Sequence, residues 1–271
     1  MKNVSKIYLL ITLIYFSSIQ IVNAQNPKIQ EIAKKTHESL MKIKDLRFLI
    51  HTTKKPFSSK DTIKLKAYGL LHLNNNQPTS YYIVSKWSKD YTIEKFDNIH
   101  VSKTIFTADS LDYEKEINLY DLKNYSIENY KFLTQTNEIL FKHNLNIFFS
   151  KKNVFNYYRK FYSTWFNDSV SIEENIFKNI PVYIITISEN SENREDRITN
   201  YTSKYFIRKD NFLPIAYSFY GEFEAMYETV FTEIEYLEIN PKLPLDFFKI
   251  DPTIKEVTPR AFYEEAKKYN L

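Results

Sequence analysis

The chain has 271 residues, a formal net charge of +4, no cysteine and only two glycines. The lack of cysteine excludes disulfides, thiol nucleophiles and cysteine-ligated metals. Basic and acidic residues are interspersed, which argues against a nucleic-acid or anionic-membrane binder, and two glycines are too few for a phosphate-binding loop, a dinucleotide fingerprint or a nucleophile elbow.

Residues 1–24 have the pattern of a secretory signal peptide. Lys2 and Lys6 come first, an apolar run from Ile7 to Phe16 follows, and Val22-Asn23-Ala24 supplies small side chains for cleavage. A membrane-spanning helix needs roughly 20 apolar residues, and polar residues interrupt this run earlier. We therefore expect cleavage near Ala24, no transmembrane anchor, and a periplasmic or secreted mature protein.

A helix is predicted over residues 27–44. Asn26 is a good capping residue and Pro27 suits the first helical position. Helical spacing then gives one apolar stripe, made of Ile29, Ile32, Ala33, Leu40, Met41 and Ile43.

Strands follow the helix. Residues 62–73 alternate between apolar and polar side chains with period two, which is typical of a strand with one buried face. Asp97-Asn98 joins two further strands as a hairpin turn, with asparagine providing the positive φ that glycine usually provides. The predicted strands of this half are 46–50, 62–73, 80–87, 91–96 and 99–106.

The middle of the chain, 107–166, has mixed spacing. Residues 137–149 and 152–166 place apolar side chains at three-four intervals, which predicts one or two helices. Strand patterns return at 182–188, 202–209, 214–220 and 227–239 with short polar connections. Sequential strands with tight turns build an antiparallel sheet, so the fold class is α+β.

The last segments carry a proline-rich aromatic run and an amphipathic tail. Pro241 and Pro244 lack the amide donor and are expected to separate the last strand from a short edge segment. Phe247, Phe248 and Ile250 would anchor that segment on the sheet. The tail, 258–271, has helical spacing and is expected to dock on the sheet or on a partner.

The order of these elements, and above all the last third, "KYFIRKDNFLPIAYSFYGEFEAMYETVFTEIEYLEINPKLPLDFFKIDP", resembles the family of the periplasmic lipoprotein carrier LolA and the related lipoprotein-sorting-like proteins. In this stretch Leu213-Pro214 follows a polar turn, a strand pair leads to Phe231, and Asn240 precedes Phe248. Gly69 within a long second strand also fits. The family's arginine-containing stretch is here "QPTSYYIVSKW" and its Asp-Gly turn is Asp-Asn, so no role is carried over to Arg47.

The resemblance implies a domain organisation and an architecture. A signal peptide (1–24) precedes a LolA-like half-barrel domain (25–258) and a C-terminal helical tail (259–271). The domain would be a single strongly curved antiparallel sheet, a half-open β-barrel, with helices covering its concave face.

A concave face lined by aromatic and aliphatic side chains would suit acyl chains. Core packing explains the same aromatic excess, and an error of one residue in strand phase would exchange the two faces of a strand. The residues expected to line the cavity are Phe48, Ile50, Leu65, Leu71, Tyr82, Val84, Ile184, Tyr205, Ile207, Tyr217 and Phe219.

The function expected is that of a non-enzymatic periplasmic carrier or binding protein for an apolar ligand such as lipoprotein acyl chains or lipid. The alternative is a non-catalytic protein-interaction or envelope-sensor module on the same fold, with an envelope protein as its partner. No cofactor or metal is expected, since the five histidines never fall at metal-ligand spacing. A monomer without nucleic-acid partners is the simplest assembly.

Overall fold

A computed structural model of the chain describes residues 27–57, 59–87, 90–98, 100–107, 118–121, 143–150, 154–155, 169–190, 198–223, 226–244, 246–250 and 260–271. The elements are, in chain order, α2 (Pro27–Met41), β1 (Asp45–Lys55), β2 (Ile63–Asn74), β3 (Gln77–Trp87), β4 (Asp90–Phe96), β5 (His100–Thr107), β6 (Asn118–Asp121), α5 (Leu145–Phe148), β7 (Ser169–Phe177), β8 (Ile180–Asn190), β9 (Ile198–Arg208), β10 (Pro214–Phe223), β11 (Met226–Ile239) and α7 (Arg260–Lys267). The signal peptide predicted at 1–24 lies outside the described residues.

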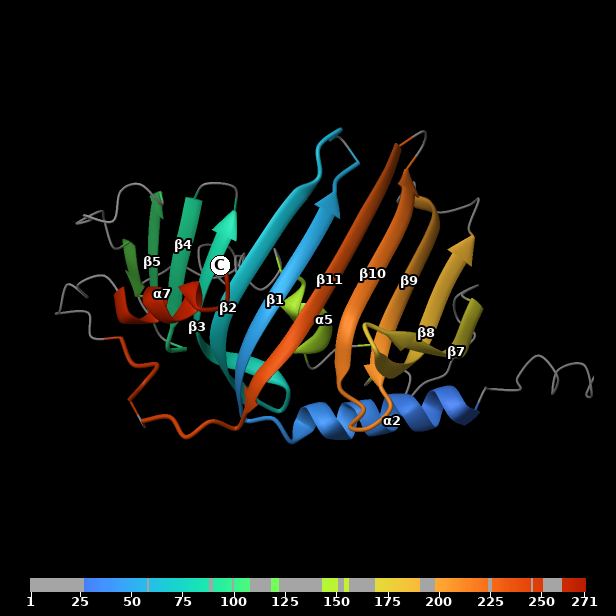
Figure 1. Cartoon of the computed structure of the whole chain (residues 1–271), viewed down its shortest axis with the longest axis horizontal. Coiled ribbons are helices and arrows are strands. Elements are labelled where there is room, and N and C mark those ends of the chain that lie inside the picture. Colours follow the sequence, from blue (N-terminus) through green and yellow to red (C-terminus); the bar gives the residue numbers. More distant parts are fainter. Residues whose placement is uncertain are drawn as a thin grey trace, which may run out of the picture.

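The strands of the described residues all belong to one antiparallel sheet of 11 strands, in the order β6-β5-β4-β3-β2-β1-β11-β10-β9-β8-β7. The first and last strands of the chain, β1 and β11, pair at its centre, so each half of the chain builds one half of the sheet (Figure 1). The end strands β6 and β7 do not pair with each other in the described part of the chain. This confirms the α+β fold with one curved antiparallel sheet that is not closed into a barrel.

Asparagine forms the tight turns of this glycine-poor chain. Positive φ angles are found at Asn75 and Asn76 between β2 and β3, at Asn98 between β4 and β5, and at Asn179 between β7 and β8. Neither glycine has a positive φ. Asparagine tolerates the left-handed region better than other non-glycine residues, so the prediction made for Asn98 is confirmed.

Strand register divides the side chains between two faces of the sheet. We call the face that carries Phe48, Ile50 and Thr52 of β1 face A, and the face that carries Arg47 and Leu49 face B. The largest apolar core lies on face A and includes the buried side chains of α2 and α5. A second core lies on face B over β1 to β4, and a third lies on face B over β8 and β10.

Helix α2 begins at Pro27 as predicted and lies across the lower ends of β8, β9 and β10 (Figure 1). Ile29, Ile32, Ala33 and Leu40 are buried, as the apolar stripe predicts. The helix ends at Met41, however, and the Met41 side chain is 39% exposed. Ile43 is buried beyond the helix end, in the turn that leads into β1.

The helices predicted in the middle of the chain can be compared with the structure only in part, and the second half contains one strand more than predicted. Only a short helix, α5, is described within 137–149, and most of 152–166 lies outside the described residues. The second half also contains a strand that the sequence analysis missed: β7 pairs with β8 through the two-residue turn Lys178-Asn179. Its sequence, SVSIEENIF, is largely exposed and lacks the apolar run by which the other strands were identified.

The proline-rich run after β11 packs on face B and forms no strand in residues 240–244 and 246–250. Phe247 and Phe248 pack against the face-B core, with their rings 6.2 Å from Tyr82 and 6.1 Å from His72 respectively. The Ile250 amide donates to Asp97 Oδ2 at 3.0 Å. These residues therefore anchor the segment as expected, but over a face of the sheet and not along its edge.

Candidate functional site: face A of the open sheet

Face A carries a continuous row of side chains across both halves of the sheet. Each member is the cross-strand partner of the next, so the row contains no gap between β2 and β7. The row is Leu65, Thr52, Thr232, Tyr217, Tyr205, Ile185 and Ile172. Cross-strand neighbours on one face touch, so the row forms a single apolar band with hydroxyl groups near its middle.

The buried hydroxyl groups of this band have neutral partners. Thr52 Oγ1 lies 3.1 Å from Thr232 Oγ1, and Asn144 Nδ2 donates to Thr232 Oγ1 at 3.0 Å. Ser203 Oγ and the Tyr217 hydroxyl lie 3.5 Å apart. The pKa of Tyr217 lies above its ordinary value, because burial raises it more than the hydrogen bond with Ser203 lowers it. The centre of face A therefore offers apolar surface with uncharged hydrogen-bonding groups.

The upper end of face A is the part most distant from α2 (Figure 1). Val230, Phe219, Ser203 and Ile187 form the next row there. The Phe219 ring covers Gly221, where an added Cβ would come within 2.8 Å of it, and Phe57 lies 3.7 Å from the same position. Glycine at position 221 therefore leaves room for the Phe219 ring at this end of face A.

Charged side chains on face A are few and paired. Lys54 Nζ lies 2.7 Å from Glu228 Oε1 near the upper end of the sheet. Glu94 is buried in β4 and accepts a hydrogen bond from the Tyr81 hydroxyl. Burial, together with the adjacent Glu94 carboxyl, raises the pKa of Tyr81 well above its ordinary value. Both groups lie to the sides of the central band.

Eight of the eleven residues predicted to line the cavity lie on face A. They are Phe48, Ile50, Leu65, Leu71, Tyr205, Ile207, Tyr217 and Phe219. All eight are buried or partly buried. Seven of them belong to the face-A core or pack against it, and Leu65 is buried next to Thr52 but is not part of that core. Their role in binding stays a prediction.

The other three, Tyr82, Val84 and Ile184, point to face B. Tyr82 and Val84 pack in the core below α7, and Ile184 packs in the core over β8 and β10. They were expected on the same face as the other eight. That prediction is wrong, because the phase of their strands differs by one residue from the predicted phase. Both faces of β3 and β8 are apolar, so alternation could not identify the inward side.

Several face-A residues were missed by the sequence analysis. Thr52, Thr232, Ser203 and Asn144 are polar and were not considered for an apolar cavity, and β1 was predicted to end at 50, before Thr52. Val230, Thr232 and Ile234 are the buried positions of β11, and the alternation of Glu233 and Glu235 with Ile234 was the signal that could have given the phase of that strand.

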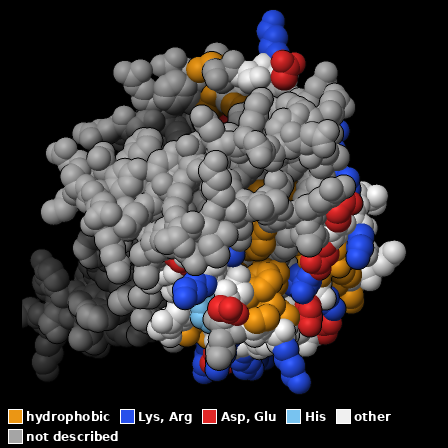
Figure 2. Space-filling model, turned by 90° about the vertical axis from the view of Figure 1, so that its left-hand side faces the viewer, with side chains coloured by type: hydrophobic (Ala, Val, Ile, Leu, Met, Phe, Trp, Pro, Cys, Tyr) orange, Lys and Arg blue, Asp and Glu red, His pale blue; other side chains and the backbone are white. Residues whose placement is uncertain are grey.

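The described part of the chain shows no group of three or more His, Cys, Asp or Glu side chains placed to hold a metal ion. None of its helices combines the length and the apolar composition needed to cross a membrane. On the side of the molecule in Figure 2, acidic and basic side chains of the described residues are interspersed around apolar ones.

No known family model matches the chain, and no curated protein matches it. Solved structures do. The lipoprotein LppX of Mycobacterium tuberculosis matches with a TM-score of 0.35 and 9% identity over 82% of this chain and 100% of its own. MucB of Pseudomonas aeruginosa, solved with MucA, matches with a TM-score of 0.35 and 8% identity over 83% of this chain and 61% of its own.

A LolA superfamily protein of Nitrosomonas europaea matches with a TM-score of 0.27 and 9% identity, over 82% of this chain and 97% of its own. A member of the family that the sequence resembles is therefore among the solved structures similar to this chain. Likeness at this level assigns no ligand and no partner to it.

Proposed function

We propose that this protein binds an apolar ligand, such as an acyl chain of a lipid or lipoprotein, against face A and carries or holds it without chemical change. The observation that supports the proposal is the continuous row of apolar and uncharged hydroxyl-bearing side chains from Leu65 to Ile172 on a sheet that is not closed. Apolar ligands gain binding free energy from burial on such a surface in proportion to the area removed from water.

The upper end of face A is the proposed position of the acyl chain. Leu65, Val230 and Phe219 provide apolar contacts there, and α2 covers the opposite end of the strands. The hydroxyl pair of Thr52 and Thr232 lies next to Leu65 in the band. These hydroxyls are buried and already paired, so the apolar side chains are the groups proposed to contact the ligand. An acyl chain fits such side chains better than an ionised head group, because burying a charge against them costs desolvation.

Envelope localisation belongs to the same proposal. Residues 1–24 would direct export and be removed near Ala24, leaving a half-barrel domain (25–258) and a helical tail. Sequencing the N-terminus of the mature protein from its native host checks this, and an uncleaved chain would contradict it.

A matched pair of variants on β2 tests the ligand site. Leu65 faces the band, whereas the adjacent Lys64 is exposed on face B. Leu65→Trp should fill ligand space and weaken binding of a fluorescent fatty-acyl probe at least tenfold, whereas Lys64→Trp should leave binding unchanged. Thermal melting of both variants shows whether each remains folded.

Two results would count against the carrier proposal: wild-type protein that binds no probe, or a folded Leu65→Trp variant that binds as well as wild type. Native mass spectrometry of protein from its native host separates the two functional classes. A bound lipid supports the carrier, whereas a stoichiometric protein supports the interaction module.

A further inference from the structure

Face B over β1 to β4 is covered by the chain's own tail, and this contact is independent of the ligand proposed for face A. The surface beneath the tail is apolar and largely aromatic. It belongs to the face-B core, which Phe247 and Phe248 of the proline-rich run also contact, and has Arg47 and Lys66 at its border. The buried side chains of this core on the strands are Leu49, Tyr68, Leu70, Tyr82, Val84, Tyr91 and Ile93. We call this surface the tail groove.

The tail contacts the groove through residues of one helical face and the turn after it. The ring of Tyr269 stacks on Tyr68, with centroids 5.0 Å apart and planes inclined by 14°. Ala266 is completely buried, and Leu271 is 7% exposed. Lys66 Nζ donates to the Asn270 carbonyl at 3.0 Å. The groove therefore holds both side chains and backbone of the tail.

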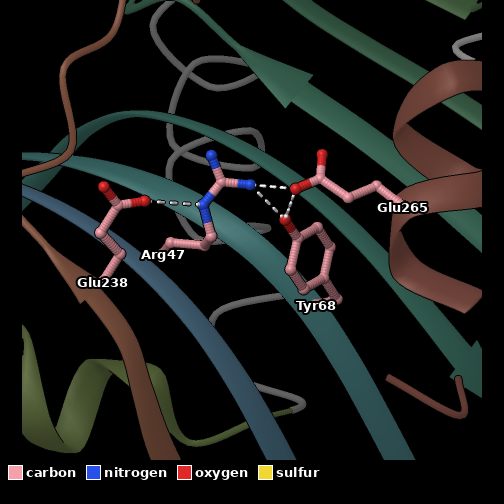
Figure 3. A network of polar contacts seen from close by, with 4 residues as sticks. All are labelled: Arg47, Tyr68, Glu238 and Glu265. Carbon is pink, nitrogen blue, oxygen red and sulfur yellow. Dashed lines mark hydrogen bonds and ion pairs between the residues drawn. The ribbon is translucent and has the colours of Figure 1, made fainter. Parts of the chain in front are cut away.

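A polar cluster fixes the position of α7 along the groove (Figure 3). Arg47 Nη1 donates to the Tyr68 hydroxyl at 2.6 Å and to Glu265 Oε1, and the Tyr68 hydroxyl donates to the same Glu265 oxygen at 2.6 Å. Arg47 Nε also lies 3.3 Å from Glu238 Oε2 as an ion pair. Partial burial lowers the pKa of Arg47, but hydrogen bonding to Tyr68 and the nearby carboxylates raise it more, so the guanidinium stays charged.

These contacts define what the groove recognises: a carboxylate that meets Arg47, a small residue directly after it, and an aromatic ring four residues after the carboxylate. In the tail these are Glu265 and Ala266 of α7 and Tyr269 in the turn after it. An amphipathic helix that places such residues in an apolar groove is a recurrent mode of peptide recognition. The eight residues of α7 are too few for a stable isolated helix, so the helix depends on its contacts with the groove.

We propose that the tail groove is a docking site for an amphipathic helix of a partner protein that presents a carboxylate to Arg47, and that α7 is its intramolecular competitor. The partner is a protein helix with the Glu-Ala-x-x-Tyr chemistry of the tail. The positive charge of Arg47 favours a carboxylate over a basic side chain at that position. Binding of the partner displaces α7.

A labelled peptide of residues 258–271 is the probe, and the full-length chain is the receptor. In the chain, Glu265→Arg places a second guanidinium beside Arg47 and should release α7. The wild-type peptide should then bind at least tenfold more tightly to this variant than to the wild-type chain. A peptide that itself carries Glu265→Arg should bind the same variant at least tenfold more weakly than the wild-type peptide.

The double variant Arg47→Glu, Glu265→Arg restores an opposite-charge pair within the chain and should again bind the wild-type peptide poorly. Lys267→Glu is the control, because Lys267 is exposed and pairs with Glu264 on the same helix. It should leave peptide binding at the wild-type level. Should Glu265→Arg fail to fold, Tyr269→Ala removes the stacking contact and should increase peptide binding in the same way.

The proposal is overturned if the wild-type peptide binds the wild-type and released chains equally, or binds neither. It is also overturned if sedimentation shows a dimer of the wild-type chain that the peptide dissociates, because the groove would then be an interface between two copies.

Discussion

The ring of Phe48 occupies the space that a side chain at position 69 would need. An added Cβ on Gly69 would come within 2.8 Å of Ile83 Cγ1 and 3.0 Å of the Phe48 ring. Both neighbours are fully buried, so neither can move without disturbing the face-A core. The glycine is therefore required by packing and not by backbone conformation, since its φ is not positive.

Gly69→Ala should lower the free energy of unfolding by about 1–3 kcal/mol through overpacking. Gly221→Ala is the matched comparison, because its Cβ would meet the ring of Phe219, which is only partly buried and has room to shift. We expect the smaller loss at Gly221. Urea denaturation of both variants measures the difference, and equal stability of Gly69→Ala and wild type would refute the packing argument.

Glu174 links α2 to the sheet through two lysines. Hydrogen bonds from Lys209 and Lys28 lower the pKa of the Glu174 carboxyl to about 2. Because the folded-state pKa lies below the ordinary value, the stabilising contribution is fully present above pH 5 or so and is lost as the pH falls toward about 2. NMR titration of the carboxyl carbon should show this pKa, and Lys209→Ala should raise it toward the ordinary range. A wild-type pKa near 4 would show that Lys28 and Lys209 do not stabilise the ionised form of this carboxyl group.

At the scale of elements, Asn240 joins the end of β11 to the turn between α2 and β1. Its Oδ1 accepts from the Lys44 amide at 2.7 Å and from the Asp45 amide at 3.2 Å, and its Nδ2 donates to the Lys42 carbonyl at 3.1 Å. Its backbone has a φ of 55°. One side chain thus pairs with three backbone groups of the segment between α2 and β1.

Two substitutions separate these roles of Asn240. Asn240→Gly removes the side-chain hydrogen bonds but accommodates the left-handed backbone. Asn240→Ala removes the same hydrogen bonds and also strains the backbone, because alanine disfavours a positive φ. The free energy of unfolding of the Asn240→Ala variant should be about 1–2 kcal/mol lower than that of Asn240→Gly, because a residue with a side chain pays that cost in the left-handed region. Denaturant unfolding measures both variants. If alanine proves as stable as glycine, the backbone conformation at this position carries no cost.

The elements also show what the sequence could specify. In β2, Lys64 and Lys66 alternate with buried Leu65 and Ala67, and the predicted phase is right. In β3 and β8 both faces are buried in the central rows, because α2 and α5 pack on face A while the tail and the aromatic cluster of Phe177, Phe206 and Phe231 lie on face B. Polar alternation disappears there, so strand phase depends on tertiary contacts that no local pattern contains.

At the scale of the whole molecule, the two halves of the sheet meet only where β1 pairs with β11 in the described residues. These strands are separated by most of the chain, so their pairing closes a very long loop. The helix before the strands, the hairpins that the local patterns mark and the α+β class were predictable, since sequential hairpins are local. The docking of the tail on Arg47 and Tyr68 was not, because it depends on residues about 200 positions apart.

The pairing of β1 with β11 and the core shared by the two halves predict one cooperative unfolding transition. The face-A core contains buried side chains from both halves, including Phe48, Ile83, Ile185 and Ile207, so neither half keeps a complete core when the other unfolds. Circular dichroism and tyrosine fluorescence should therefore report the same thermal midpoint. The midpoint should not change with EDTA or with reductant, because the chain has no cysteine and the described residues form no metal-binding cluster. Two separated transitions would show that the halves fold as independent units, and a midpoint lowered by EDTA would reveal a metal site in the remaining residues.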